Sequence, residues 1–176
     1  MRAILSLAFI LLTVSASPAL AESAAQKFVG VWSGQTISTT AEGLEQRDLA
    51  VTVTAKDKSF VVKWTTIIRK DGKSDRREFQ VEFQATPREG VYSAAMRTNM
   101  FGAREPLDPL KGDPYVWARI KGDTLTVHAL HILDDGGYEM QVYDRTVAGD
   151  TMNLKFSRVR DGQQLVGITG SLKKAK

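Results

Sequence analysis

The sequence contains no cysteine and only two histidines among its 176 residues. The absence of cysteine excludes disulfides, thiol catalysis and thiolate metal sites. The chain also lacks a phosphate-binding glycine loop, a Gly-x-Ser-x-Gly elbow, a His-Glu-x-x-His motif and a dinucleotide fingerprint. His128 and His131 are three residues apart in a strand-like segment, so they point to opposite faces and do not share a metal ion. We therefore expect a protein that is not an enzyme, with no catalytic residues, no metal site and no cofactor.

Long apolar runs are missing too, except near the N-terminus. Residues 4–14 are mostly apolar, follow Arg2 and precede the small-x-small sequence Ala19-Leu20-Ala21, which is the order typical of a secretory signal peptide. We expect residues 1–21 to be removed and the mature chain to start at Glu22. No later stretch approaches the run of about 20 apolar residues that a membrane helix needs. The predictions are a mature chain without an integral membrane segment, and secretion to a bacterial periplasm.

The sequence also has only a small excess of one charge sign over the other. The formal net charge is +4, from 24 basic and 20 acidic residues. The basic pair Arg76-Arg77 stands between Asp75 and Glu78, so it does not form an uninterrupted basic face. We expect no nucleic-acid partner, and the oligomeric state stays open.

What the sequence has is a regular series of turns with alternating segments between them. Gly and Asp turn signals recur along the chain, and in residues 76–85 the row Phe79, Val81, Phe83 alternates with polar residues. This period of two predicts strands with one wet and one dry face. Short, even turns favour pairing of neighbouring strands over the crossovers of a two-sheet sandwich. We predict an all-β fold, an antiparallel up-and-down meander of residues 22–176 closed into a single small barrel of about 8–10 strands.

The first strand-like segment carries a recognisable motif. Phe28-Val29-Gly30-Val31-Trp32 resembles the signature of the lipocalins and the broader calycin superfamily, an aromatic residue followed by Gly-x-Trp. The resemblance implies that Trp32 plugs the closed end of the barrel, where Gly30 lets the backbone approach closely. It also implies an arginine from a late strand packed across this tryptophan, for which we expect Arg145, with Arg158 as the alternative.

One connection interrupts the meander. Residues 101–114 contain three prolines, which have no backbone N–H to donate to a neighbouring strand. We expect a long loop across or beside the open end of the barrel. Two interpretations stay open: a functional lid, or a proline-stiffened strap that covers the end.

The aromatic and amphipathic residues suit a small-molecule pocket. Arg97 is of interest because a ligand carboxylate would compensate an arginine in a dry cavity, unless it faces outwards and pairs with a carboxylate at the rim. We predict a secreted, lipocalin-like protein that binds a small lipophilic or amphipathic molecule in the barrel. The alternative is a filled barrel that acts through its surface, as an envelope accessory, inhibitor or interaction protein; a cavity below about 300 Å³ would favour it. The candidate ligand-binding residues are Trp64, Phe79, Phe83, Arg97, Tyr115, Trp117, His131 and Tyr138.

Overall fold

The computed structural model describes residues 24–40, 43–57, 59–70, 72–98, 104–105 and 107–175. Within these ranges, the side chains of 37–40, 43, 44, 97, 98 and 104 are outside the description. The expected signal peptide, residues 1–21, lies outside the described residues and stays a prediction. In the described part of the chain, no helix is long and apolar enough to cross a membrane.

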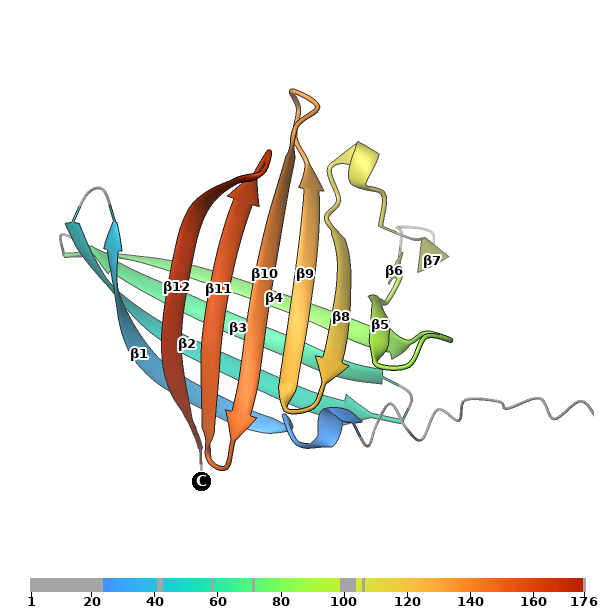
Figure 1. Ribbon diagram of the computed structural model, residues 1–176, viewed down its shortest axis with the longest axis horizontal. Coiled ribbons are helices and arrows are strands. Elements are labelled where there is room, and N and C mark those ends of the chain that lie inside the picture. The colour runs from blue at the N-terminus through green and yellow to red at the C-terminus, as the bar shows by residue number, and fades with distance from the viewer. Residues whose placement is uncertain are drawn as a thin grey trace, which may run out of the picture.

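Ten antiparallel strands of the described chain form a closed barrel (Figure 1). They are β1 (Gly30–Thr40), β2 (Gly43–Lys56), β3 (Ser59–Lys70), β4 (Lys73–Ala85), β5 (Val91–Ala94), β8 (Tyr115–Lys121), β9 (Thr124–Ile132), β10 (Tyr138–Ala148), β11 (Thr151–Arg160) and β12 (Gln163–Lys174). Each strand pairs with the next barrel strand along the chain, and β1 pairs with β12 to close the ring. The predicted up-and-down barrel is therefore confirmed. Its closure hides the sheet edges that an open meander would leave unpaired.

The connection between β5 and β8 carries the other elements. The short strands β6 (Arg97–Thr98) and β7 (Arg104–Glu105) pair with each other outside the barrel sheet. They are followed by the 3₁₀ turn η1 (Pro109–Lys111), whose first free amide, that of Leu110, donates to the Asp108 side chain. The long loop expected over 101–114 thus contains part of a two-stranded ribbon and one capped turn, and residues 101–103 and 106 lie outside the described residues.

One end of the barrel is filled by side chains. The rings of Phe60 and Phe83 lie 5.3 Å apart, and Tyr92 packs edge-on against Phe60 at 5.0 Å. A helical turn at residues 24–26 leads into Phe28 next to this end (Figure 1). The fully or almost fully buried side chains of this core include Phe28, Trp32, Val53, Phe60, Val62, Phe83, Leu125, Met152 and Leu172.

Trp32 plugs this filled end. Its side chain is 0% exposed, and its indole Nε1 donates a 2.9 Å hydrogen bond to the carbonyl of Phe28. Gly30 has a φ of 133°, and a Cβ there would lie 2.7 Å from Cε of Lys174. A side chain larger than hydrogen would therefore be strained at this position, which explains why it is occupied by glycine.

The cation beside Trp32 differs from the expected one. Nζ of Lys174, in β12, lies 5.1 Å from the centre of the Trp32 ring. Arg145 is buried, but the rings on which its guanidinium lies are those of Trp64 and Tyr143. The barrel floor is thus formed by Gly30 and Trp32 with a lysine, and Arg145 belongs to the wall above it.

Candidate functional site

Above the filled end, the barrel encloses a cavity of about 320 Å³. Strands β2, β3 and β4 form one wall and strands β10, β11 and β12 form the other. The inner rows of these strands contribute mainly apolar and aromatic side chains. They include Leu49, Trp64, Phe79, Tyr143, Leu154, Phe156 and Ile168.

A second cavity, of about 430 Å³, adjoins the first. The two share Trp64, Phe79, Gln141 and Tyr143 in their walls, so these residues stand between them. Further parts of its wall come from β8, β9 and Leu107 of the β5–β8 connection. The described part of this connection therefore lies beside the open end, where it was expected. Both volumes fall within the range of about 300 to 1,000 Å³ that is usual for small-molecule pockets.

Three of these shared residues, Trp64, Phe79 and Tyr143, belong to an aromatic cluster contributed by four strands. Trp64 of β3 stacks on Phe79 of β4 at 5.5 Å between ring centres, and it lies 5.3 Å from Tyr143 of β10. Tyr143 in turn lies 4.7 Å from Phe156 of β11. Such rings present a rigid apolar surface that loses little conformational freedom when a ligand binds.

Arg145 lies against this cluster, and its side chain is the one charged group in the buried core of the described chain. Its Cζ lies 5.1 Å from the Trp64 ring centre and 5.5 Å from that of Tyr143. Nη1 donates a long hydrogen bond, 3.4 Å, to the carbonyl of Tyr143, and Nε has no acceptor. Burial lowers the pKa of the Arg145 guanidinium to about 10, while Tyr143 and Asp144 oppose the shift. The group therefore remains a cation at neutral pH.

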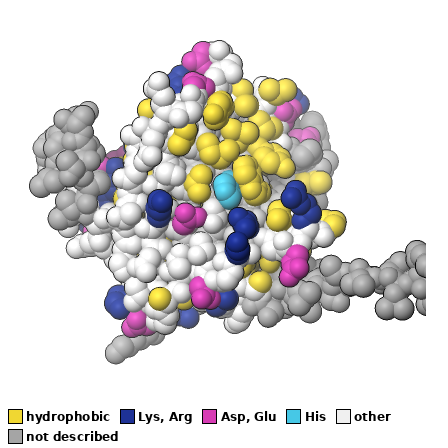
Figure 2. All heavy atoms as spheres, viewed as in Figure 1, with side chains coloured by type: hydrophobic (Ala, Val, Ile, Leu, Met, Phe, Trp, Pro, Cys, Tyr) yellow, Lys and Arg dark blue, Asp and Glu magenta, His cyan; other side chains and the backbone are white. Residues whose placement is uncertain are grey.

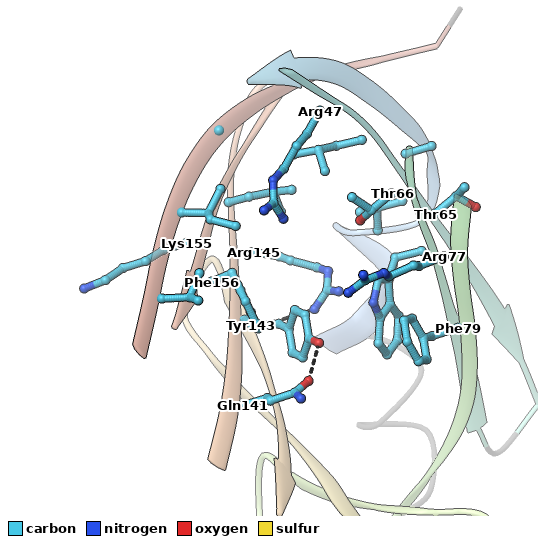
Figure 3. Close-up of a pocket in the computed structure, with 18 of the residues that line it drawn as sticks. Arg47, Thr65, Thr66, Arg77, Phe79, Gln141, Tyr143, Arg145, Lys155 and Phe156 are labelled. Atoms are coloured by element: carbon cyan, nitrogen blue, oxygen red, sulfur yellow. Dashed lines mark hydrogen bonds between the residues drawn. The ribbon is translucent and has the colours of Figure 1, made fainter. Parts of the chain in front are cut away.

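Three other arginines reach the inner wall, and each faces a carboxylate. Arg47 pairs with Glu45, both largely buried. Arg77 pairs with Asp75 at 2.9 Å, and both are more than half exposed. Figure 3 shows Arg47, Arg77 and Arg145 reaching into the cavity from β2, β4 and β10. Arg158 has a more distant partner, because its Nε lies 3.8 Å from a carboxylate oxygen of Glu139.

A row of polar groups continues along β10 from the cavity towards the open end. The Tyr143 hydroxyl donates to Oε1 of Gln141 at 2.7 Å (Figure 3). Nε2 of Gln141 in turn donates to Glu139 at 2.7 Å. Burial raises the pKa of the Tyr143 hydroxyl, which therefore stays protonated and acts as a donor. In the described ranges, no three His, Asp or Glu side chains gather closely enough to hold a metal ion.

The structure brings together some of the predicted site residues. Trp64 and Phe79 line both cavities, and His131 lines the second. Phe83 is inside the barrel but is part of the filled end, with a side chain that is 0% exposed. The side chain of Arg97 lies outside the described residues, and its backbone belongs to β6.

Tyr115, Trp117 and Tyr138 line neither cavity. Val116 and Ala118 occupy the inner face of β8, so their neighbours Tyr115 and Trp117 point outwards. There Trp117 stacks on His128 of β9, with ring centres 4.6 Å apart and planes inclined by 3°. Trp64 and Phe79 do line a cavity, but the sequence did not show which face of β8 points inwards, because that segment has bulky residues on both faces.

The outer surface around these residues is apolar. Figure 2 shows hydrophobic side chains gathered over this face, towards the open end of β8 to β10. Tyr115 is 52% exposed and Tyr138 is 41% exposed. His128 belongs to this face, and burial is the main cause that lowers the pKa of its imidazole, so it is neutral at pH 7.

Several residues of the cavity are absent from the list of candidate ligand-binding residues, notably Arg47, Arg77, Tyr143, Arg145 and Phe156. A signal for them exists in the sequence. Arg77 is in phase with Phe79, and Arg47 is in phase with Leu49. A charged residue in phase with the apolar row of its strand is therefore a cue for a polar contact inside a barrel.

Comparison with known proteins adds no family assignment. No protein-family model matches the chain, and no curated protein matches it. The function of the protein is therefore inferred from the geometry of its cavities.

Proposed function

We propose that the protein binds a small lipophilic or amphipathic molecule inside its barrel, as a lipocalin-like carrier or binding protein. The observation that carries this proposal is the cavity of about 320 Å³ with an aromatic wall, above a barrel end that is filled. A barrel whose interior served only as a core would be packed along its whole length, because voids cost stability.

The chemistry of the wall supports the same conclusion. Trp64, Tyr143 and Phe156 supply apolar surface, and Gln141 supplies a polar tip that can orient a ligand. This combination of a mainly apolar wall with a few polar groups is typical of small-molecule sites. With the secretory leader expected at residues 1–21, the place of action in this proposal is a bacterial periplasm.

A second candidate function is favoured by the outer surface. Tyr115 and Tyr138 are exposed on the face that Figure 2 shows to be rich in hydrophobic side chains. In this alternative, the barrel acts through that face, as an envelope accessory or an inhibitor of another protein.

A titration with an uncharged fluorescent lipophile, N-phenyl-1-naphthylamine, tests the proposal. The mature wild-type protein is expected to bind one probe molecule saturably. Tyr143→Ala should weaken binding by about tenfold, the equivalent of about 1.4 kcal/mol. Tyr138→Ala is the matched control, because it removes the same side chain from the same strand outside both cavities, and it should leave the affinity unchanged.

Two outcomes would contradict the proposal. The first is no saturable binding, and the second is binding that Tyr138→Ala weakens and Tyr143→Ala does not. Either would favour the surface-acting barrel. Native mass spectrometry of protein purified from its own host would add the mass of any co-purified ligand.

A further inference from the structure

Arg145 has fewer partners than a buried guanidinium requires. A guanidinium carries five N–H donors, and one long hydrogen bond, to the Tyr143 carbonyl, is recorded for this side chain. Its Nε is buried without an acceptor, and no carboxylate forms an ion pair with it among the described residues. A buried cation in this condition is costly, because two aromatic rings and one long hydrogen bond replace only part of its lost hydration.

The acidic neighbours are engaged elsewhere. Asp144 follows Tyr143 in the chain, but its carboxylate accepts a 2.7 Å hydrogen bond from Thr126 on the outer face of the sheet. Glu45 pairs with Arg47, and Glu139 lies beside Arg158. Among the described arginines that line the cavity, Arg145 is therefore the one without a carboxylate partner.

The position of Arg145 defines the direction in which a bound anion would lie in the cavity. In the sheet it pairs with Leu125 and Leu154, and Leu125 belongs to the filled core. The next inner residue towards the open end, Tyr143, pairs with Phe156. The charge thus lies at the bottom of the cavity, below the rings of Tyr143 and Phe156. The other arginines that line the cavity, Arg47, Arg77 and Arg158, each lie beside a carboxylate.

From this arrangement we infer that the ligand is an amphipathic monocarboxylate, bound with its carboxylate against Arg145 and its apolar tail directed to the open end. The inference rests on the proposed function. A carboxylate fits because its two oxygens match the planar fork of the guanidinium. A single uncompensated cation suits a monoanion better than a doubly charged phosphomonoester.

The test compares two ligands of equal chain length, dodecanoate and 1-dodecanol, by displacement of N-phenyl-1-naphthylamine at pH 7.5. The wild-type protein is expected to prefer dodecanoate. Arg145→Met should weaken dodecanoate binding by about tenfold to one-hundredfold, the range for hydrogen bonds to charged groups. The affinity for 1-dodecanol should change by less than about threefold, since the apolar contacts are retained. Arg119→Gln, which removes an exposed charge from β8, is the control and should alter neither affinity.

A second measurement does not depend on a variant that folds. The carboxyl carbon of dodecanoate labelled with ¹³C at position 1 can be titrated by NMR in complex with the wild-type protein. An adjacent buried cation favours the charged form, so the pKa of the bound carboxyl group should lie below that of the free acid. A carboxyl group that points to solvent would titrate normally.

The outcomes separate this inference from the proposed function. Equal affinity for the acid and the alcohol, a normal carboxyl pKa, or dodecanoate binding unchanged in folded Arg145→Met would overturn the inference and leave the proposed function standing. Failure of both ligands and of the neutral probe to bind would instead remove the proposed function itself.

Discussion

Trp32 shows how much one side chain contributes to the filled end. It is completely buried, its Nε1 donates to the Phe28 carbonyl, and Lys174 lies over its ring. We expect Trp32→Ala to lower the free energy of unfolding by about 3 to 5 kcal/mol, because it leaves a large cavity and an unpaired carbonyl. Thermal or urea denaturation followed by circular dichroism would measure this loss.

Trp117→Ala is a suitable control for that experiment. Trp117 lies on the outer face, where it stacks on His128 and remains partly exposed. Its removal should cost only about 1 kcal/mol, the scale of a ring-stacking contact. If the two variants lost the same stability, Trp32 would not be the plug of the barrel.

Arg145 stands in contrast to Trp32 at the same scale. Both are buried, but Trp32 has the hydrogen bond that its polar atom needs, whereas Nε of Arg145 has none. The burial of Trp32, with its hydrogen bond made, is therefore explained by its contribution to the stability of the fold. The unpaired cation of Arg145 lowers stability, and this is the reason for our proposal that a ligand carboxylate pairs with it.

At the scale of elements, β1 and β12 approach each other closely at Gly34. A Cβ on Gly34 would overlap the carbonyl oxygen of Ser171 and lie 3.1 Å from a methyl group of Leu172. We expect Gly34→Ala to cost about 1 to 3 kcal/mol, because the two strands would have to separate. The free energy of unfolding from urea titration is the measurement.

The matched control is Gly167→Ala, in β12. There a Cβ would meet only the side-chain amide of Gln164, 3.0 Å away, which can move. This substitution should change stability by about 0.5 kcal/mol or less, as is usual for surface positions. Equal effects of the two alanines would mean that backbone crowding is not the reason for the glycine in β1.

For the whole molecule, closure depends on the first and last strands. The register pairs between β1 and β12 are Trp32 with Lys174 and Ser33 with Lys173. Directly opposed residues in antiparallel strands have Cα atoms about 4.5 to 5.5 Å apart, a separation that a disulfide can bridge. The native chain has no cysteine to compete for pairing.

The double substitution Ser33→Cys with Lys173→Cys should therefore stabilise the barrel when oxidised. A cross-link between residues this far apart in the chain is expected to add about 2 to 4 kcal/mol, mainly by restricting the unfolded chain. Thermal denaturation of the oxidised and the reduced forms of the same variant would measure the gain. An oxidised form that melted at the same temperature as the reduced form would show that the two strands do not meet in this register.

Much of the fold could be predicted because its causes are local. A period of two along each segment determines which side chains share a face, and short turns determine which strands are neighbours. Strands with one dry face and no helices to cover it must close on themselves. The role of Trp32 followed in the same way, from a glycine and an aromatic residue within one short segment.

The sequence by itself thus determined the strands, their order and the filled end. Only the tertiary structure decided the composition of the cavity. Trp64 and Arg145 are far apart in the chain, and closure of the barrel brings them to within 5.1 Å. The inner phase of β8 was decided by its pairing with β5 and β9, which placed Tyr115 and Trp117 outside. Likewise, no local pattern shows that Arg145 lacks a carboxylate partner, because that depends on the side chains that opposite walls of the barrel bring together.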